Sequence, residues 1–231
     1  MEEIIRLQPD RLSVFNYAHL PERFMPQRRI NAEDLPSPAQ KLAMLHNSIE
    51  QLTAAGYRYI GMDHFALPDD ELAIAQEDGR LQRNFQGYTT HGHCDLIGLG
   101  VSAISQIGDL YSQNSSDLTV YQDTLDVPEL PVRRGLHCNA DDRVRREVIQ
   151  RLICEFELQF APIEQEFGIV FRDYFADVWP DLQQMARDGL ISLSDSSIDI
   201  KPAGRLLARS VCMLFDRYLS EQSRQRFSRV I

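Results

Sequence analysis

Two short polar sequences stand at the ends of segments that are predicted to be β-strands. Asn16-Tyr17-Ala18-His19 ends the apolar run that begins at Leu12, and Asp63-His64 follows the aromatic run 57–62. In barrel enzymes the working residues stand at the C-terminal ends of strands. A carboxylate beside an imidazole can act as an acid/base pair or hydrogen-bond a substrate. Asp63 and His64 are therefore a candidate substrate pocket, with a helix-capping aspartate and a packed histidine as the alternative.

The sequence Gly98-Leu99-Gly100-Val101-Ser102-Ala103 fits the pattern G-x-G-x-x-A. A dinucleotide site needs a strand before this pattern, a helix after it and an acidic residue about 20 positions later. The pattern lies late in this chain and not in a first βαβ unit. Tight backbone packing, or close contact with a small ligand, explains the small residues better.

The four cysteines, Cys94, Cys138, Cys154 and Cys212, are far apart, and no CxxC or CxxxCxC sequence occurs. Cys154 and Cys212 lie in helical apolar patterns, which predicts buried, inert thiols. His91-Gly92-His93-Cys94 has ligand-type residues, but a zinc site needs three or four convergent ligands. We therefore expect a solvated loop there and no metal site in this chain.

The elements that would position these residues read as an α/β fold. Ser37 and Pro38 are suited to begin a helix that ends near Gly56, and a strand follows over 57–62. With the strand at 12–17 this makes a strand–helix–strand unit, which is typical of a parallel sheet or βα barrel. We expect a barrel part over 1–125 and a linker over 126–138.

The remainder, 139–231, reads as a mostly helical domain. We expect helices from Asn139 or Asp141, near Pro162, and over 173–187 with a break at Pro180. Two strands flank the turn 195–197, and a last helix starts near Pro202. Helix, small hairpin and helix in this order resemble a winged helix.

The formal net charge of −10 argues against binding to nucleic acid or anionic lipid, because both are polyanions. Arg143, Arg145 and Arg146 are followed closely by Glu147, Glu155 and Glu157, so this face is mixed and suits a solvated or domain-docking surface better than DNA binding. No stretch approaches the ~20 apolar residues of a membrane span, and the start of the chain is acidic, unlike a secretory signal. We expect a cytoplasmic protein with no nucleic-acid or membrane partner.

Several sequences together resemble the oxygen-independent coproporphyrinogen III oxidases of bacterial haem synthesis. They are PDRLSVFNYAHLP (9–21), DLPSP (34–38), YIGMDHFA (59–66), RNFQGYTT (83–90), GLGVSAIS (98–105) and FSRVI (227–231). The resemblance covers essentially the whole chain, and the combination is specific although each sequence alone is not.

The resemblance implies oxidative decarboxylation of two propionates of coproporphyrinogen III to vinyl groups, which gives protoporphyrinogen IX without oxygen. It implies a [4Fe–4S] cluster, two molecules of S-adenosylmethionine and an electron donor, with the cofactors supplying the difficult chemistry. It also implies a fold: the C-terminal portion of an incomplete (β/α) radical SAM barrel, followed by a mostly α-helical, winged-helix-like C-terminal domain that covers the active site.

By the same resemblance Ala18 contacts the second S-adenosylmethionine and Ile104 the first. The family holds its cluster with a CxxxCxC motif in its N-terminal half, and this motif is absent here. We therefore expect the chain to correspond to the C-terminal half of such an enzyme and to be inactive alone. The alternative hypothesis is a haem- or porphyrin-binding module related to the radical SAM haem chaperones.

Overall fold

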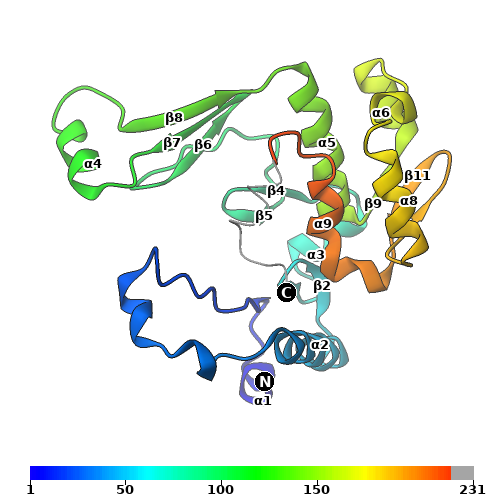
Figure 1. Cartoon of the computed structure of the whole chain (residues 1–231), viewed down its shortest axis with the longest axis horizontal. Helices are drawn as coiled ribbons and strands as arrows, with labels where there is room; N and C mark the ends of the chain where they lie inside the picture. Colours follow the sequence, from blue (N-terminus) through cyan, green and yellow to red (C-terminus); the bar gives the residue numbers. More distant parts are fainter. Residues whose placement is uncertain (220–231) are drawn as a thin grey trace.

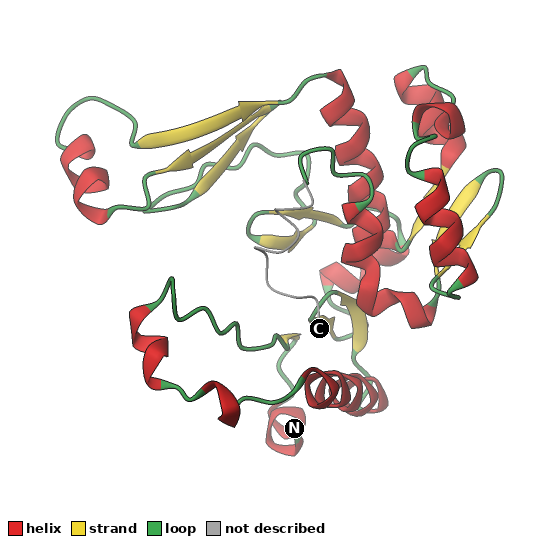
Figure 2. Cartoon of the chain, in the orientation of Figure 1, coloured by secondary structure: helices red, strands yellow, loops and turns green. Residues whose placement is uncertain are grey.

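The computed structural model describes residues 1–219, so the terminal sequence 227–231 that contributes to the resemblance lies outside the described residues. Figures 1 and 2 show a lower part, a projecting sheet and a helical part on the opposite side. The elements before the projecting sheet are α1 (Glu2–Leu7), β1 (Arg11–Ser13), the 3-10 turns Met25–Arg29 and Ala32–Asp34, α2 (Pro38–Ala54), β2 (Arg58–Gly61), β3 (His64–Ala66), α3 (Glu71–Glu77), β4 (Gln82–Asn84) and β5 (Gly87–Thr89).

Helix α2 begins and ends where its sequence predicts. The Ser37 side chain accepts a hydrogen bond from Gln40 N, and the Gln40 side chain accepts one from Ser37 N, a reciprocal capping box. Pro38 occupies the first turn, where a missing N–H costs nothing. Gly56, with φ +93°, follows the last turn in the left-handed region.

The three-stranded sheet beside α2 differs from the predicted parallel arrangement. Its order is β1-β3-β2 and both pairings are antiparallel, so β1 and β2 run in the same direction with β3 between them. Gly61 (φ +147°) and Met62 (φ +57°) turn the chain back at once after β2. The place of a parallel neighbour is thereby taken by β3, whose residues the sequence did not mark as a strand. The described sheets do not close into a barrel.

A separate antiparallel sheet, order β6-β7-β8, projects from the body with α4 at its far end (Figure 1). Its elements are β6 (Ile104–Ile107), β7 (Leu110–Asn114), α4 (Leu118–Leu125) and β8 (Val132–His137). The predicted linker 126–138 is thus not irregular throughout, because β8 pairs with β7 over much of it. No hydrophobic side chain between 82 and 137 is buried, so this sheet has no core of its own in the described structure.

The helical part has the element order of a winged helix. Its elements are α5 (Ala140–Glu155), β9 (Glu157–Gln159), α6 (Phe160–Phe167), α7 (Phe171–Tyr174), α8 (Trp179–Arg187), β10 (Ile191–Leu193), β11 (Ser197–Ile200), the 3-10 turn Pro202–Leu207 and α9 (Ala208–Met213). The predicted hairpin 191–200 is confirmed, and β9 adds a third strand in the order β10-β11-β9. The break expected at Pro180 falls just before it, since Pro180 lies in the first turn of α8. None of the helices over residues 1–219 is both long and apolar enough to cross a membrane.

One hydrophobic core joins residues from both sides of the predicted linker. Ile60, Leu72 and Leu81 pack in the same cluster as Leu152 and Phe175. At the C-terminal end of α5, polar contacts also join residues from the two sides of the predicted linker. Gln76 Nε2 donates to Ile60 O (2.6 Å) and to Cys154 O (2.8 Å), and Tyr88 Oη donates to Ile153 O (3.1 Å). The last carbonyls of a helix have no partner within it, so side chains from the preceding part complete α5.

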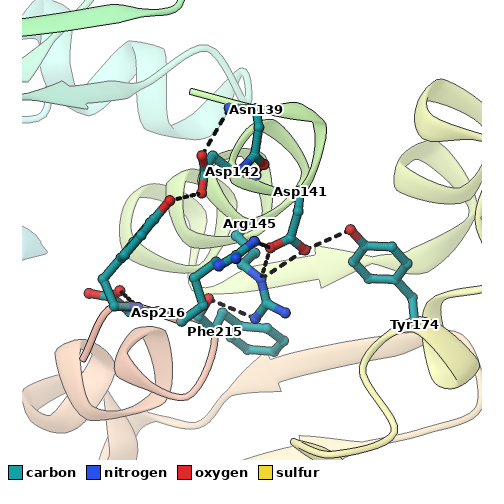
Figure 3. Close-up of polar contacts among 9 residues, drawn as sticks. Asn139, Asp141, Asp142, Arg145, Tyr174, Phe215 and Asp216 are labelled. Atoms are coloured by element: carbon teal, nitrogen blue, oxygen red, sulfur yellow. Dashed lines mark hydrogen bonds and ion pairs between the residues drawn. The ribbon is translucent and has the colours of Figure 1, made fainter. Parts of the chain in front are cut away.

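The start of α5 also makes polar contacts with other parts of the chain, and we call this set of contacts around Asp141 the Asp141 clamp (Figure 3). Asp141 accepts hydrogen bonds from Tyr174 Oη (2.6 Å), from Arg145 Nε (3.0 Å) and from Arg217. Arg145 also donates to Phe215 O (3.1 Å). These contacts hold the segment after α9 against the first turn of α5, and they explain why the carboxylate is ionised.

We predict that Gln76→Met destabilises the chain by about 1–3 kcal/mol, because it removes the donor to Ile60 O of β2 and to Cys154 O at the end of α5. Urea unfolding followed by circular dichroism measures this difference. The control is Gln122→Met on α4, whose side chain is exposed and makes no hydrogen bond with the described residues, and it should change the free energy of unfolding little. Equal effects of the two substitutions would contradict the assigned role of Gln76.

We predict that the stabilising contribution of Asp141 depends on pH. Partial burial raises the pKa of this carboxyl, but the hydrogen bonds from Tyr174, Arg217 and Arg145 outweigh burial and lower it. A carboxyl whose pKa is lowered on folding stabilises fully above its unfolded pKa of about 3.9 and loses this contribution as the pH falls through the folded value.

Asp141→Asn should therefore lower the free energy of unfolding at pH 7, and this penalty should shrink below about pH 4. Urea unfolding of both proteins between pH 7 and pH 3 measures it. Asp177→Asn, at an exposed carboxylate after α7 that makes no hydrogen bond with the described residues, is the matched control and should change the free energy of unfolding little at pH 7. A penalty for Asp141→Asn that stays constant over this range would rule out the ionised clamp.

Candidate functional site

Asp63 lies in the turn of the β2–β3 hairpin and His64 begins β3, so the prediction that they follow a strand end is correct, although a second strand and not a helix comes directly after that end. His64 Nδ1 lies 2.7 Å from Asp63 Oδ1. The two residues are adjacent and the approach is poorly aligned, so the buried Nδ1 lacks a well-formed hydrogen bond. The contact with His64 nevertheless lowers the pKa of the Asp63 carboxyl more than its partial burial raises it. Asp63 is an anion at neutral pH.

Aromatic rings surround this pair. The Tyr88 ring meets the His64 ring edge-on at 5.2 Å, and the Tyr59 hydroxyl donates to Met62 O at 2.8 Å. Burial raises the pKa of Tyr59 and of Tyr88 well above the usual range, so both act as neutral donors. A Cβ at Gly61 would collide with the Tyr88 hydroxyl, which explains why only glycine fits there.

Arg83 is a cation beside this site that the sequence analysis did not single out as a candidate. It lies on β4 opposite Tyr88 on β5, and its guanidinium stacks on the Tyr88 ring at 5.4 Å. Its charge contributes to the lowered pKa of Asp63, and its buried Nε has no hydrogen-bond partner within residues 1–219. The sequence pointed to Arg83 only through its place in the family-like string 83–90, because an arginine before a glycine turn does not by itself indicate a functional site.

Ala18 lies in the irregular segment after β1, five residues beyond Ser13, and not at the strand end that the sequence predicted. The segment starts next to the hairpin, since Val14 N donates to Asp63 O at 2.7 Å. Ala18 itself is exposed, and its carbonyl accepts from Gln27 Nε2 at 3.1 Å. The neighbouring His19 has a buried Nδ1 that is unpaired within the described part of the chain.

Ile104 begins β6 and belongs to the projecting sheet, not to the sheet of Asp63 and His64. The glycine-rich string that precedes it is bound tightly to that sheet. Asn114 Nδ2 donates to the carbonyls of Gly98 (3.2 Å) and Gly100 (3.0 Å), and a Cβ on Gly98 would lie 2.6 Å from Ile104 O. A strand, not a helix, follows, so the dinucleotide interpretation is wrong, and the close approach of backbone to backbone agrees with tight packing.

The cysteines do not form a metal site. Within residues 1–219 no group of three histidine, cysteine or carboxylate side chains could hold a metal ion. Burial raises the pKa of Cys154, and it raises the pKa of Cys212 to about 12, so both thiols stay protonated as predicted. His91 and His93 lie 6.4 Å apart, ring to ring, on an exposed turn.

The arginines at the start of α5 serve domain docking, as expected from the mixed charge of this face. Arg143 and Arg146 both pair at 3.0 Å with Asp109, in the turn between β6 and β7, and thereby tie α5 to the projecting sheet. Arg145 belongs to the Asp141 clamp.

We predict that His64→Gln raises the pKa of the Asp63 carboxyl toward its ordinary value, because the contact with the imidazole is the largest influence that lowers it. The pH titration of the Asp63 carboxyl carbon by NMR measures the change. His46→Gln, on the exposed face of α2, is the matched control and should leave the Asp63 pKa unchanged. If the Asp63 titration is the same in His64→Gln and the parent, the pair is not coupled.

Comparison with known proteins agrees with this geometry. Residues 139–207 match the HemN C-terminal domain family. The chain is 76% identical over 231 residues to the oxygen-independent coproporphyrinogen III oxidase of Pseudomonas aeruginosa, covering 100% of this chain and 50% of that protein. It is 45% identical over 228 residues to the protein of the same name from Thermostichus vulcanus, covering 98% of this chain and 70% of that protein.

A solved structure is similar over nearly the whole chain. It is coproporphyrinogen III oxidase (HemN) from Escherichia coli, described as a radical SAM enzyme; the TM-score is 0.91 at 53% identity, with 94% of this chain and 50% of that chain covered. This chain thus spans about half the length of its Pseudomonas and Escherichia relatives. With the fold, the strings and the identities in agreement, the chain belongs to the oxygen-independent coproporphyrinogen III oxidase family.

Proposed function

We propose that this chain contributes the C-terminal half of the active site of an oxygen-independent coproporphyrinogen III oxidase. The reaction is the oxidative decarboxylation of two propionates of coproporphyrinogen III to vinyl groups, which gives protoporphyrinogen IX. The observation that carries this proposal is the 76% identity over all 231 residues to the Pseudomonas aeruginosa protein of that name.

The segment that carries Ala18 supports a contact with one S-adenosylmethionine molecule. A pocket of about 350 Å³, lined by Phe15, Asn16 and Tyr17 on one side and Met44 and Leu45 of α2 on the other, borders this segment. An apolar pocket with a few polar atoms is typical of a site for a small organic ligand. The unpaired Nδ1 of His19, next to Ala18, is a polar atom that such a ligand could satisfy.

Ile104 is proposed to contact the other S-adenosylmethionine. It is half-buried at the start of β6, and the glycines before it bring backbone close to backbone. An aliphatic side chain held by so tight a segment offers a fixed apolar surface to a ligand.

Asp63 and His64 are proposed to face the tetrapyrrole. Because Asp63 is ionised, its oxygens accept hydrogen bonds, and the pyrrole N–H groups of a porphyrinogen are suitable donors. The Tyr88 ring packs edge-on against the His64 ring, and the Tyr59 hydroxyl holds the Met62 carbonyl next to the pair. These residues would orient the substrate and hold protons, while the cofactors supply the oxidising chemistry.

The residues of this chain do not fit the [4Fe–4S] cluster that the family uses. Its cysteines do not have the required spacing, and Cys138, Cys154 and Cys212 are buried separately. No step through a cluster is therefore assigned to these residues, and the electron donor is proposed to act on the complete enzyme.

A chimera tests the proposed function. We predict that the Pseudomonas protein stays active when these 231 residues replace its matching half, and that the isolated chain forms no vinyl product. The assay is anaerobic conversion of coproporphyrinogen III, with S-adenosylmethionine and a chemical reductant, followed by fluorescence of the oxidised product. A folded, cluster-loaded chimera that releases no carbon dioxide from the substrate would refute the proposal.

A further inference from the structure

A small polar pocket lies between β4, the turn at His91, β6 and the first half of α5. Its volume is about 170 Å³, and Gln82, His91, Gln106, Arg146 and Glu147 contribute to its lining. A water molecule occupies about 30 Å³ of liquid, so the pocket has room for a carboxylate-sized group. Neither the proposed cofactor contacts nor the Asp63–His64 pair uses it.

Hydrogen-bond donors without partners gather at this pocket. Arg146 donates to Asp109 through Nη2 (3.0 Å), whereas its buried Nη1 has no partner within residues 1–219. The side-chain amides of Gln82 and Gln106 make no hydrogen bond with the described residues. Buried donors are normally satisfied, so the unpaired Nη1 of Arg146 and the unpaired Nε of Arg83, with the half-buried amides of Gln82 and Gln106, are suited to a ligand with several acceptor oxygens.

The charges around the pocket favour an anion. The carboxylates there are already engaged, since Glu147 pairs with Arg151 at 2.8 Å and Asp109 is shared by two arginines. The charged residues that line the pocket or pair with its lining are Arg83, Arg146, Arg151, Asp109 and Glu147. Three cations against two anions leave a local surplus of one positive charge in a chain whose net charge is −10.

We infer that this pocket binds a carboxylate group, with Arg146 as the charged residue and the amides of Gln82 and Gln106 as neutral donors. Arginine with amide donors suits the planar, two-oxygen geometry of a carboxylate. That the carboxylate belongs to a propionate of the tetrapyrrole rests on the proposed function. A propionate held here would not be free to react, so the pocket would distinguish side chains that are kept from those that are converted.

The test uses the 231-residue chain and three probes: coproporphyrin III, its tetramethyl ester and propionate. Fluorescence titration should show that Arg146→Gln weakens binding of the free tetracarboxylate about 10- to 100-fold, the range expected for losing a charged hydrogen bond. Arg143→Gln is the matched control, because Arg143 also pairs with Asp109 but does not line the pocket. It should bind within about twofold of the parent, and the ester should bind the parent and Arg146→Gln equally weakly.

Gln106→Leu is the second variant, because it removes a donor without breaking the ion pairs of α5. It should weaken binding of the tetracarboxylate but not of the ester. Side-chain amide signals of Gln82 and Gln106, followed by NMR, should shift when propionate is added to the parent and not to Arg146→Gln. Melting curves identify any variant that is not folded.

The possible outcomes distinguish failure of the proposed carboxylate pocket from failure of the proposed enzymatic function. Tetracarboxylate binding that is equal in the parent, Arg146→Gln and Gln106→Leu, or equal for acid and ester, would overturn the pocket and leave the proposed function standing. Propionate-dependent shifts at Gln82 and Gln106 without any binding of the macrocycle would support the pocket and count against the tetrapyrrole as its ligand.

Discussion

The end of helix α5 is the constraint on which the rest of the structure depends. A helix leaves its last carbonyls unpaired, and here two of them are satisfied by Gln76 and Tyr88, which come from earlier in the chain. The Tyr88 side chain also packs against the core cluster that contains Ile60 and Leu152. The position of the β4–β5 hairpin, and with it Arg83 and the His64 ring, therefore follows from where α5 stops.

Polar and apolar contacts act on α5 in different ways. Its apolar face, led by Val148 and Leu152, is buried and supplies most of the driving force. Its polar residues determine which segments pack against it. Asp141 binds the segment after α9, and Arg143 and Arg146 bind the projecting sheet through Asp109. One helix thereby holds two other parts of the chain through its polar side chains, and the segment after α9 also packs into the core through Phe215.

The sequence predicted the elements that carry local signals. Ser37, Pro38 and Gly56 placed α2 correctly, and the hairpin 191–200 was found from its apolar runs and turn. It did not predict β3, because Asp63 and His64 interrupt the apolar pattern, nor β8, because all six of its residues are exposed and show no alternation. A strand that is ordered by hydrogen bonds to one neighbour, without burial, leaves little trace in the residue pattern.

The candidate site shows the same limit. Asp63 and His64 were found because they follow a strand, but Arg83 and Tyr88 reach them only through the pairing of β4 with β5. The matched family domain begins at residue 139, yet the helix that opens this domain is completed by side chains near residues 76 and 88. The family domain is thus not structurally independent of the residues before it. A fragment cut at residue 139 would begin with a helix whose C-terminal carbonyls have lost the side chains that cap them.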